Sequence, residues 1–272
     1  MTTVGVIGTG NMGSALVRGW LRSPEPDMRL LVWDKVGDTV ERLLGEGGIA
    51  AVACLEDLVI AAEIILVVVK PKDGPEVLGA MAGLLRAEQT VVSSMAGVTL
   101  EKVRSILGPG PAAFRIMPNL GVELGVGAVA VAAEPGMDGA RVKDVLDLFE
   151  PLGLAVSVPE EMIDAVTAVS GSGPAFLALA IESLEDGAVA AGLSRPLART
   201  LVRQMAVAAA RLLPLHSDSP GELREFLAAN GELDEAGVAT LEEGGVRSAF
   251  REAVNAAVNR SRGSGGAHVS PR

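Results

Sequence analysis

The sequence predicts an α/β protein in which an N-terminal, doubly wound parallel sheet is followed by an all-helical domain. Over roughly the first 135 residues, short β-branched runs alternate with longer amphipathic stretches, as in repeated βα units. These apolar runs are nearly continuous, which is typical of strands buried on both faces. Beyond Pro159 the β-branched runs end, and Ala-rich stretches with helical periodicity follow.

The composition is that of an ordinary globular protein. The chain has 272 residues, 49% hydrophobic and 21% charged, and at about 150 residues per domain this length favours two domains. The net charge of -11 opposes binding to a phosphate backbone, so no nucleic-acid partner is expected. Cys54 is the single cysteine, which excludes an internal disulfide and fits a reducing compartment.

No basic leader precedes the first expected strand, and the apolar run at 64–69 is far shorter than the roughly 20 residues of a membrane helix. We therefore expect a cytoplasmic protein with no membrane segment. The chain contains no tyrosine and two histidines, His216 and His268, so a catalytic tyrosine is excluded and no metal site is expected.

Periodicity predicts the individual elements. In the sheet domain we expect helices at 12–21, 36–44 and 138–150, and strands at 4–7, 29–33, 49–53, 64–69, 90–94, 112–117, 127–132 and 155–158. In the helical part we expect helices at 163–169, 175–191, 196–213 and 245–260. The predicted domains are 1–160 and 161–262, and the Gly/Ser-rich composition of 263–272 predicts a disordered tail.

The strongest motif is a G-x-G-x-x-G, formed by Gly8, Thr9, Gly10, Asn11, Met12 and Gly13, which follows a strand and opens a helix. In this context the backbone N–H groups and the helix N-terminus can hold a pyrophosphate, so the motif predicts a Rossmann-type dinucleotide site. The alternative is a glycine-rich turn that serves only close packing of the helix on the sheet.

Asp34 ends the second expected strand, about 20 residues after the glycine motif, where a carboxylate can accept from an adenosine ribose hydroxyl. Its charge favours NADH over NADPH, because it would face the extra phosphate, although Lys35 beside it can offset that repulsion. The alternative role for Asp34 is a helix N-cap, which is compatible with cofactor binding.

Further residues follow strands whose carboxyl ends should meet at the ligand-binding edge of the sheet. These are Val69, Lys70 and Pro71 after the fourth strand and Ala96 and Gly97 after the fifth, and we expect them on the nicotinamide side. For Lys70 the alternative is a solvated lysine at a strand end. In the helical part, Ser170, Gly171, Ser172, Gly173 and Pro174 precede a long helix, where they either hold a substrate carboxylate or form an ordinary helix cap.

Further motifs accompany the glycine motif and Val69-Lys70-Pro71 along the chain. They are Ala96-Gly97-Val98-Thr99, Arg115-Ile116-Met117-Pro118-Asn119, Val169 to Ala175, Glu182 to Ala188 with Gly192-Leu193, and Leu241 to Arg247. In their order and spacing these motifs together resemble the pyrroline-5-carboxylate reductase family, and they span nearly the whole chain.

The resemblance implies a C-terminal helical dimerisation domain, a homodimer or a larger oligomer of dimers, and an active site completed by the partner subunit. The implied reaction is hydride transfer from NADH or NADPH to the C=N carbon of 1-pyrroline-5-carboxylate, giving L-proline in the last step of proline biosynthesis. A protonated cyclic imine is already electrophilic, so the protein needs to supply orientation and a carboxylate clamp more than a strong acid. The resemblance adds Asn119 to the cofactor site, and we take Lys70, Ser172 and Asp234 as the catalytic candidates.

The chain departs from the family pattern in two places. Where the family has a Ser-Pro-Gly-Gly-x-Thr loop for the substrate carboxylate, this chain has Asn230, Gly231, Glu232 and Asp234 among the aligned residues, so two acids stand where an anion should bind. Leu120 stands where the family usually has Thr.

Three functions follow from these features. The first is reduction of pyrroline-5-carboxylate itself. The second is reduction of a less anionic imine, with Asp234 as ion-pair partner or proton donor. The third is a dinucleotide-binding protein without turnover. Alternatively, Glu232 and Asp234 are the solvated cap of a helix starting near Glu235, with the substrate held elsewhere.

Overall fold

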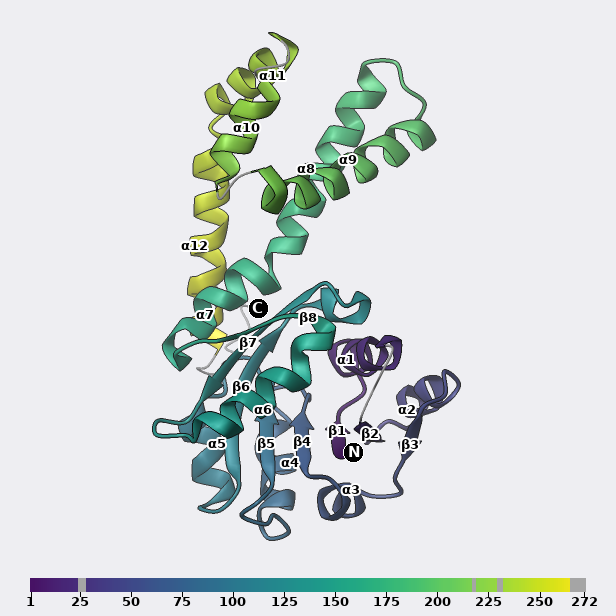
Figure 1. The fold of residues 1–272 in the computed structure, drawn as a ribbon, viewed down its shortest axis with the longest axis vertical. Helices are drawn as coiled ribbons and strands as arrows, with labels where there is room; N and C mark the ends of the chain where they lie inside the picture. Colours follow the sequence, from purple (N-terminus) through teal and green to yellow (C-terminus); the bar gives the residue numbers. More distant parts are fainter. Residues whose placement is uncertain (24–27, 217–218, 229–231, 265–272) are drawn as a thin grey trace, which may run out of the picture. The chain divides into compact units, whose positions relative to one another are not determined.

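The structure is a computed structural model that describes residues 1–23, 28–216, 219–228 and 232–264. It divides into two compact units (Figure 1). The first, the sheet unit, contains Met1–Gly171 together with the chain from Ala257, and the second, the helical unit, contains Ser172–Ala256. The units therefore divide at Gly171 rather than at the predicted residue 160.

The sheet unit is built on one eight-stranded sheet of order β3-β2-β1-β4-β5-β6-β7-β8. The order reverses between β1 and β4, which places a topological switch point at the carboxyl ends of these two strands. The strands are β1 (Thr2–Ile7), β2 (Met28–Trp33), β3 (Ile49–Ala51), β4 (Ile64–Val67), β5 (Thr90–Ser93), β6 (Ala112–Pro118), β7 (Gly127–Ala133) and β8 (Gly153–Ser157). The predicted α/β class is confirmed.

The sheet is mixed rather than wholly parallel, which corrects the expected all-parallel arrangement. β1 to β6 run parallel, whereas β7 is antiparallel to β6 and β8 is parallel to β7. The reason is the length of the connection. Only the short 3-10 helix η1 (Leu120–Leu124) lies between β6 and β7, and a parallel crossover needs a dozen or more residues.

Helices cover both faces of the sheet and bury an apolar core on each. The core on one face includes buried residues of α1 (Asn11–Arg22), α2 (Gly37–Leu44) and α6 (Gly139–Phe149). The core on the other includes residues of α3 (Leu55–Ala61), α4 (Gly74–Ala82) and α5 (Leu100–Leu107). Trp20 on α1 is fully buried and its Nε1 donates to the Leu148 carbonyl at 2.8 Å. Burial on both faces explains the continuous apolar strands.

The end of the sheet unit leads into the helical unit through short helical segments. These are η2 (Glu150–Leu152) before β8, then η3 (Glu160–Met162), α7 (Ile163–Val166) and a single π-helical turn, η4 (Thr167–Gly171). Arg115 on β6 is buried and its Nη1 lies 3.2 Å from Glu160 Oε1. That same oxygen accepts from the Leu100 backbone N–H at 2.7 Å, which joins η3 to β6 and α5.

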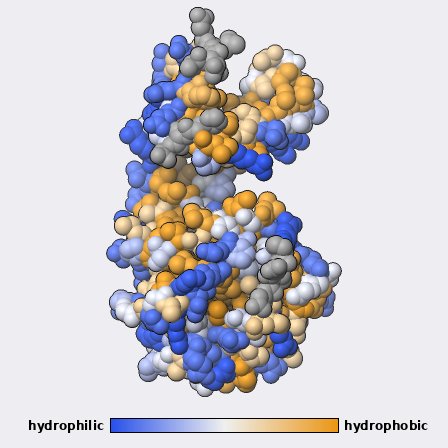
Figure 2. Space-filling model, in the orientation of Figure 1, coloured by the Kyte–Doolittle hydropathy of each residue, from blue (hydrophilic) through white to orange (hydrophobic). Residues whose placement is uncertain are grey.

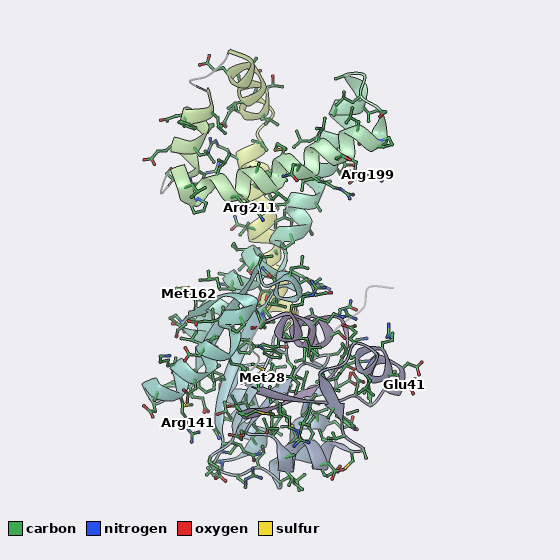
Figure 3. All side chains as sticks on the ribbon, turned by 45° about the vertical axis from the view of Figure 1, so that its right-hand side comes forward. Met28, Glu41, Arg141, Met162, Arg199 and Arg211 are labelled. Carbon is green, nitrogen blue, oxygen red and sulfur yellow. The ribbon has the colours of Figure 1, made fainter. Side chains whose placement is uncertain are left out.

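The helical unit contains no strand among its described residues, as predicted. Its helices are α8 (Gly173–Ala190), α9 (Arg195–His216), α10 (Pro220–Ala228), α11 (Glu232–Glu243) and most of α12 (Val246–Ser264). Arg199 and Arg211 project from α9 (Figure 3). Glu185 on α8 is buried and lies 3.6 Å from Arg199 Nε and 3.5 Å from Arg203 Nε, which ties α8 to α9.

Most element boundaries differ from the sequence predictions by a residue or two. The predicted helix 163–169 is wrong in its second half, where the π turn begins at Thr167. The predicted tail begins too early, because α12 continues to Ser264; the rest of it, 265–272, lies outside the described residues. Helix α10 was not predicted, and α11 begins at Glu232 rather than near Glu235.

Candidate active site

A cavity of about 470 Å³ lies at the carboxyl ends of β1, β2 and β4, next to the switch point of the sheet. Its lining comes from the glycine loop after β1, the β2–α2 loop, the β4–α4 loop and the first turns of α4. Six residues predicted for the cofactor line this cavity: Gly8, Gly10, Asp34, Lys35, Val69 and Lys70. The glycine loop, the end of β2 and the β4–α4 loop therefore converge on one pocket.

Each glycine of the motif meets a different requirement. Gly8 has φ +98°, and a Cβ there would lie 2.4 Å from the Val68 carbonyl oxygen. A Cβ on Gly13 would lie 1.9 Å from the Gly8 carbonyl oxygen, so this glycine lets α1 pack closely against the loop. A Cβ on Gly10 would meet nothing within 4 Å. Gly10 thus leaves room in the cavity, at the N-terminus of α1, for a phosphate to approach the backbone.

The Asp34 carboxylate ties the end of β2 to the glycine loop. Its Oδ2 accepts from the Thr9 backbone N–H at 2.6 Å and from the Thr9 hydroxyl at 3.2 Å, and its Oδ1 accepts from the Val36 N–H at 2.9 Å. The Thr9 and Thr39 hydroxyl oxygens are 2.6 Å apart. These donors are all uncharged, so none of them neutralises the negative charge of the Asp34 carboxylate, which lines the cavity.

The alternative role of Asp34 as the N-cap of α2 is wrong, because Val36 occupies that position and no side chain caps the helix. Asp34 Oδ1 instead accepts from the Val36 N–H just before α2. Asp34 Oδ1 accepts only the Val36 bond, so its second lone pair can accept from a ribose hydroxyl, whereas Oδ2 already accepts two bonds from Thr9. Thr39 is a member of this cluster that sequence reasoning missed, because no local pattern distinguishes it from a solvated residue of an amphipathic helix.

Three lysines and two further acids surround the same cavity. Lys35, Lys70 and Lys72 line it together with Asp73 and Glu76. The Lys35 ammonium lies 3.1 Å from Asp73 Oδ1, so Lys35 forms its ion pair with Asp73 rather than with Asp34. Lys70 is exposed in the β4–α4 loop, so its position fits either a cofactor contact or a solvated lysine.

The remaining predicted cofactor residues do not line this cavity. Pro71 follows Lys70 in the β4–α4 loop, while Ala96 and Gly97, the latter at φ +72°, lie in the loop after β5. Asn11 and Met12 lie in the first turn of α1. Asn119 lies at the end of β6, where its Nδ2 donates to Ser170 Oγ at 3.0 Å.

The expected substrate residues are divided between the two units. Ser170 and Gly171 belong to the π turn of the sheet unit, whereas Ser172, Gly173 and Pro174 begin α8 of the helical unit. Ser172 is the N-cap of α8, and no acidic residue falls in the first turn of this helix. Asn230, Gly231 and the side chains of Glu232 and Asp234 lie outside the described residues.

The described residues contain no group of three or more His, Cys, Asp or Glu side chains arranged to hold a metal ion. The chemistry available at the cavity is that of a dinucleotide site. A helix N-terminus and open glycine backbone suit a pyrophosphate, and a carboxylate suits a ribose diol.

Comparison with known proteins agrees with this geometry. Residues 160–264 match the family model described as pyrroline-5-carboxylate reductase dimerisation, and residues 3–97 match one described as NADP oxidoreductase coenzyme F420-dependent. A pyrroline-5-carboxylate reductase of Methanosarcina acetivorans is 34% identical over 263 residues, 95% of this chain and 96% of its own. One of Synechocystis is 40% identical over 199 residues, 73% of this chain and 74% of its own.

Solved structures extend the likeness to the whole fold. A pyrroline-5-carboxylate reductase of Coxiella burnetii superposes with a TM-score of 0.89 at 27% identity, over 98% of this chain and 99% of its own. The Plasmodium falciparum enzyme with NADP bound gives 0.85 at 26% identity, over 97% and 98% of the two chains. Because the curated relatives exceed 30% identity over nearly their full length, this chain belongs to the pyrroline-5-carboxylate reductase family.

Proposed function

We propose that this protein reduces 1-pyrroline-5-carboxylate to L-proline with a reduced nicotinamide dinucleotide, the last step of proline biosynthesis. The observation that carries the proposal is the cavity at the switch point, where Gly8, Gly10 and Asp34 meet the requirements of a dinucleotide. The reaction follows from the relatives, which resemble this chain over almost all of its length.

The role of the chain in this reaction is to bind and orient. Backbone N–H groups at the start of α1 hold the pyrophosphate, and Asp34 accepts from the ribose. The bound dinucleotide supplies the hydride, which adds to the C=N carbon. A protonated imine nitrogen keeps its proton and becomes the amine of proline, so this step needs no strong acid from the protein. We propose Lys70, Ser172 and Asp234 as the catalytic residues.

Among the two reduced cofactors, we propose NADH as the better one. The supporting observation is that Asp34 has only uncharged donors as partners, while Lys35 pairs with Asp73. An uncompensated carboxylate beside the ribose repels the 2′-phosphate of NADPH. The Plasmodium falciparum enzyme with NADP bound is 26% identical to this chain, and comparing kcat/KM with NADH and with NADPH tests the preference.

The sequence at the start of α11 favours a second candidate function. Glu232 and Asp234 introduce two negative charges where the family pattern has neutral residues, which suits an imine without a carboxylate. The test follows the oxidation of NADH and NADPH by the purified protein, with pyrroline-5-carboxylate and with 1-pyrroline. Turnover that requires the carboxylate supports the proposed function, and faster turnover of 1-pyrroline supports the second. Absence of turnover with both supports a binding role.

We further propose a cytoplasmic homodimer. One helical stretch, Glu160–Ala190, is long and apolar enough to cross a membrane by length and composition, and only 11% of its most apolar window is buried. This stretch falls in the region matched by the dimerisation model. Burial against a second subunit accounts for its apolar surface without a membrane.

A further inference from the structure

The side chain of Asn119 has one permitted orientation. Its Oδ1 accepts from the Gly121 backbone N–H at 3.0 Å and from the Ala128 N–H at 3.3 Å. A flipped amide would point its NH₂ group at these two donors, which is repulsive. The Asn119 amide oxygen therefore faces η1 and β7, and its NH₂ group faces away from them.

That NH₂ group lies against Ser170, and the direction of the resulting hydrogen bond is determined. Asn119 Nδ2 donates to Ser170 Oγ at 3.0 Å, because an amide NH₂ cannot accept. The Ser170 hydroxyl proton is therefore not used in this bond. Within the part of the chain that the structure describes, no other hydrogen bond of the Ser170 side chain is found, so its proton is available to an added acceptor.

The position of Ser170 suits a ligand contact. It lies in the π turn Thr167–Gly171, and single π turns are frequent at functional sites. The turn packs on β6, since a Cβ on Gly171 would lie 2.8 Å from Met117 Cε. Because β6 runs parallel to β5, β4 and β1, its carboxyl end lies at the same edge of the sheet as the dinucleotide cavity.

The chain around Ser170 also favours an anionic acceptor. Residues 165–181 contain no acidic residue, so no neighbour along the chain repels a carboxylate there. A hydroxyl bond to a carboxylate is charge-assisted and stronger than one between neutral groups. We infer that Asn119 is a positioning residue that holds the Ser170 hydroxyl as a hydrogen-bond donor for the carboxylate of the imine substrate. This inference rests on the proposed function, and it replaces the expected role of Asn119 as a cofactor contact.

The first experiment compares Ser170→Ala with the unaltered enzyme on two imines, pyrroline-5-carboxylate and 1-pyrroline, at saturating cofactor. Loss of one charge-assisted bond predicts a rise of about tenfold in KM for pyrroline-5-carboxylate, with kcat little changed. The KM values for 1-pyrroline and for the reduced cofactor should stay the same. Ser170→Thr, which keeps the hydroxyl, should restore most of the affinity for pyrroline-5-carboxylate.

The second experiment tests whether Asn119 acts through Ser170. Asn119→Ser keeps a short neutral cap for η1 but cannot reach Ser170. The Ser170 hydroxyl then remains but is no longer held in place, so the KM for pyrroline-5-carboxylate should rise by less than in Ser170→Ala, about threefold. In the Ser170→Ala background the same change should add nothing. In Asn119→Asp the new carboxylate would accept a hydrogen bond from the Ser170 hydroxyl, which would no longer be available to the substrate. This variant should therefore raise KM more than Asn119→Ser does. Thermal denaturation of each variant shows whether it remains folded.

Failures of the two proposals are distinguishable. An unaltered enzyme that does not reduce pyrroline-5-carboxylate overturns the proposed function, and the inference with it. An active enzyme whose Ser170→Ala variant raises KM equally for both imines, or raises KM for the cofactor instead, overturns the carboxylate contact alone. Full additivity of Asn119→Ser and Ser170→Ala overturns the positioning role.

Discussion

Single residues of the glycine loop show why one motif serves two purposes. Gly8 and Gly13 are required by the protein's own backbone, since a Cβ at either position would lie within 2.4 Å of a carbonyl oxygen. Gly10 is free of such contacts and lines the cavity. The motif is therefore structural at two positions, and at the third we propose that it serves the ligand.

This difference predicts that alanine at Gly13 mainly lowers stability, whereas alanine at Gly10 mainly weakens dinucleotide binding. Gly13→Ala should lower the free energy of unfolding by about 3 kcal/mol or more, because the Gly8 carbonyl cannot move away cheaply. Gly10→Ala should cost only about 0.5–1 kcal/mol at this N-cap, yet raise the Kd for the dinucleotide at least about tenfold. Urea denaturation and fluorescence titration with NADH measure the two quantities. Equal stability of the variants would contradict the assignment.

Asp34 carries the prediction on cofactor choice. We expect the unaltered enzyme to have a higher kcat/KM with NADH than with NADPH. Asp34→Ser keeps a small acceptor but removes the charge, so it should lower the NADH/NADPH ratio of kcat/KM by about tenfold. Asp38→Ser is the matched control, because Asp38 is exposed on α2 and does not line the cavity. A ratio that is the same in both variants would show that Asp34 does not discriminate.

Among the elements, three helices of the helical unit meet at one ion pair. Arg247 Nε, at the start of α12, donates to both carboxylate oxygens of Glu242 on α11 at 2.8 Å. Arg224 on α10 lies 3.5 Å from Glu242 Oε1. The pair closes the turn between α11 and α12, where Gly245 has φ +73°. The hydrogen bond from Arg247 lowers the pKa of the Glu242 carboxyl below its usual value of 4.5.

A lowered pKa in the folded state makes stability depend on pH in one direction. The stabilisation from Glu242 is complete above the usual carboxyl pKa and is lost as the pH falls through the lowered one. Glu242→Gln should therefore reduce the Tm at pH 6, and the difference from the unaltered protein should shrink as the pH approaches 3. Glu243→Gln, one residue further along, is the control. A difference in Tm that persists unchanged at pH 3 would argue for a role other than charge pairing.

At the scale of the whole molecule, the helical unit of a single chain leaves many large apolar side chains exposed to solvent. Large hydrophobic side chains are exposed along α8 and α9, and apolar residues gather on the surface of this unit in Figure 2. They include Leu177, Leu179, Leu184, Leu197, Leu201, Met205 and Val207. Together with the match to the dimerisation model, this surface predicts that a second subunit covers the unit.

Disrupting this surface should separate the subunits. Leu179 is 65% exposed on α8, and Leu179→Asp places a charge where the partner is expected to pack, which is costly to bury. We expect a monomer by light scattering and at least about a hundredfold lower kcat/KM, because the family resemblance places part of each active site on the partner. Ile60→Asp, on α3 of the sheet unit, should remain a dimer and retain activity. A dimeric, active Leu179→Asp variant would exclude this face.

The predictability of the site depends on the range of the interactions involved. Gly8, Gly10, Gly13 and Asp34 could be predicted because a strand, a tight turn and a helix impose local spacing on them. Thr39 could not, since its hydroxyl reaches the Thr9 hydroxyl only through the packing of α2. The bond between Asn119 and Ser170 links residues 51 apart in sequence, and each lies in a motif that says nothing of the other.

The sequence by itself determined the α/β class, the dinucleotide loop, the strand positions and the all-helical second unit, because these depend on periodicity, glycine geometry and burial along short stretches. The tertiary structure alone decided the antiparallel β7, the π turn at Thr167–Gly171 and the direction of the Asn119–Ser170 hydrogen bond. The physical reason is that connection lengths, packing against β6 and competition among hydrogen-bond donors act between distant segments, where no pattern of neighbouring residues records them.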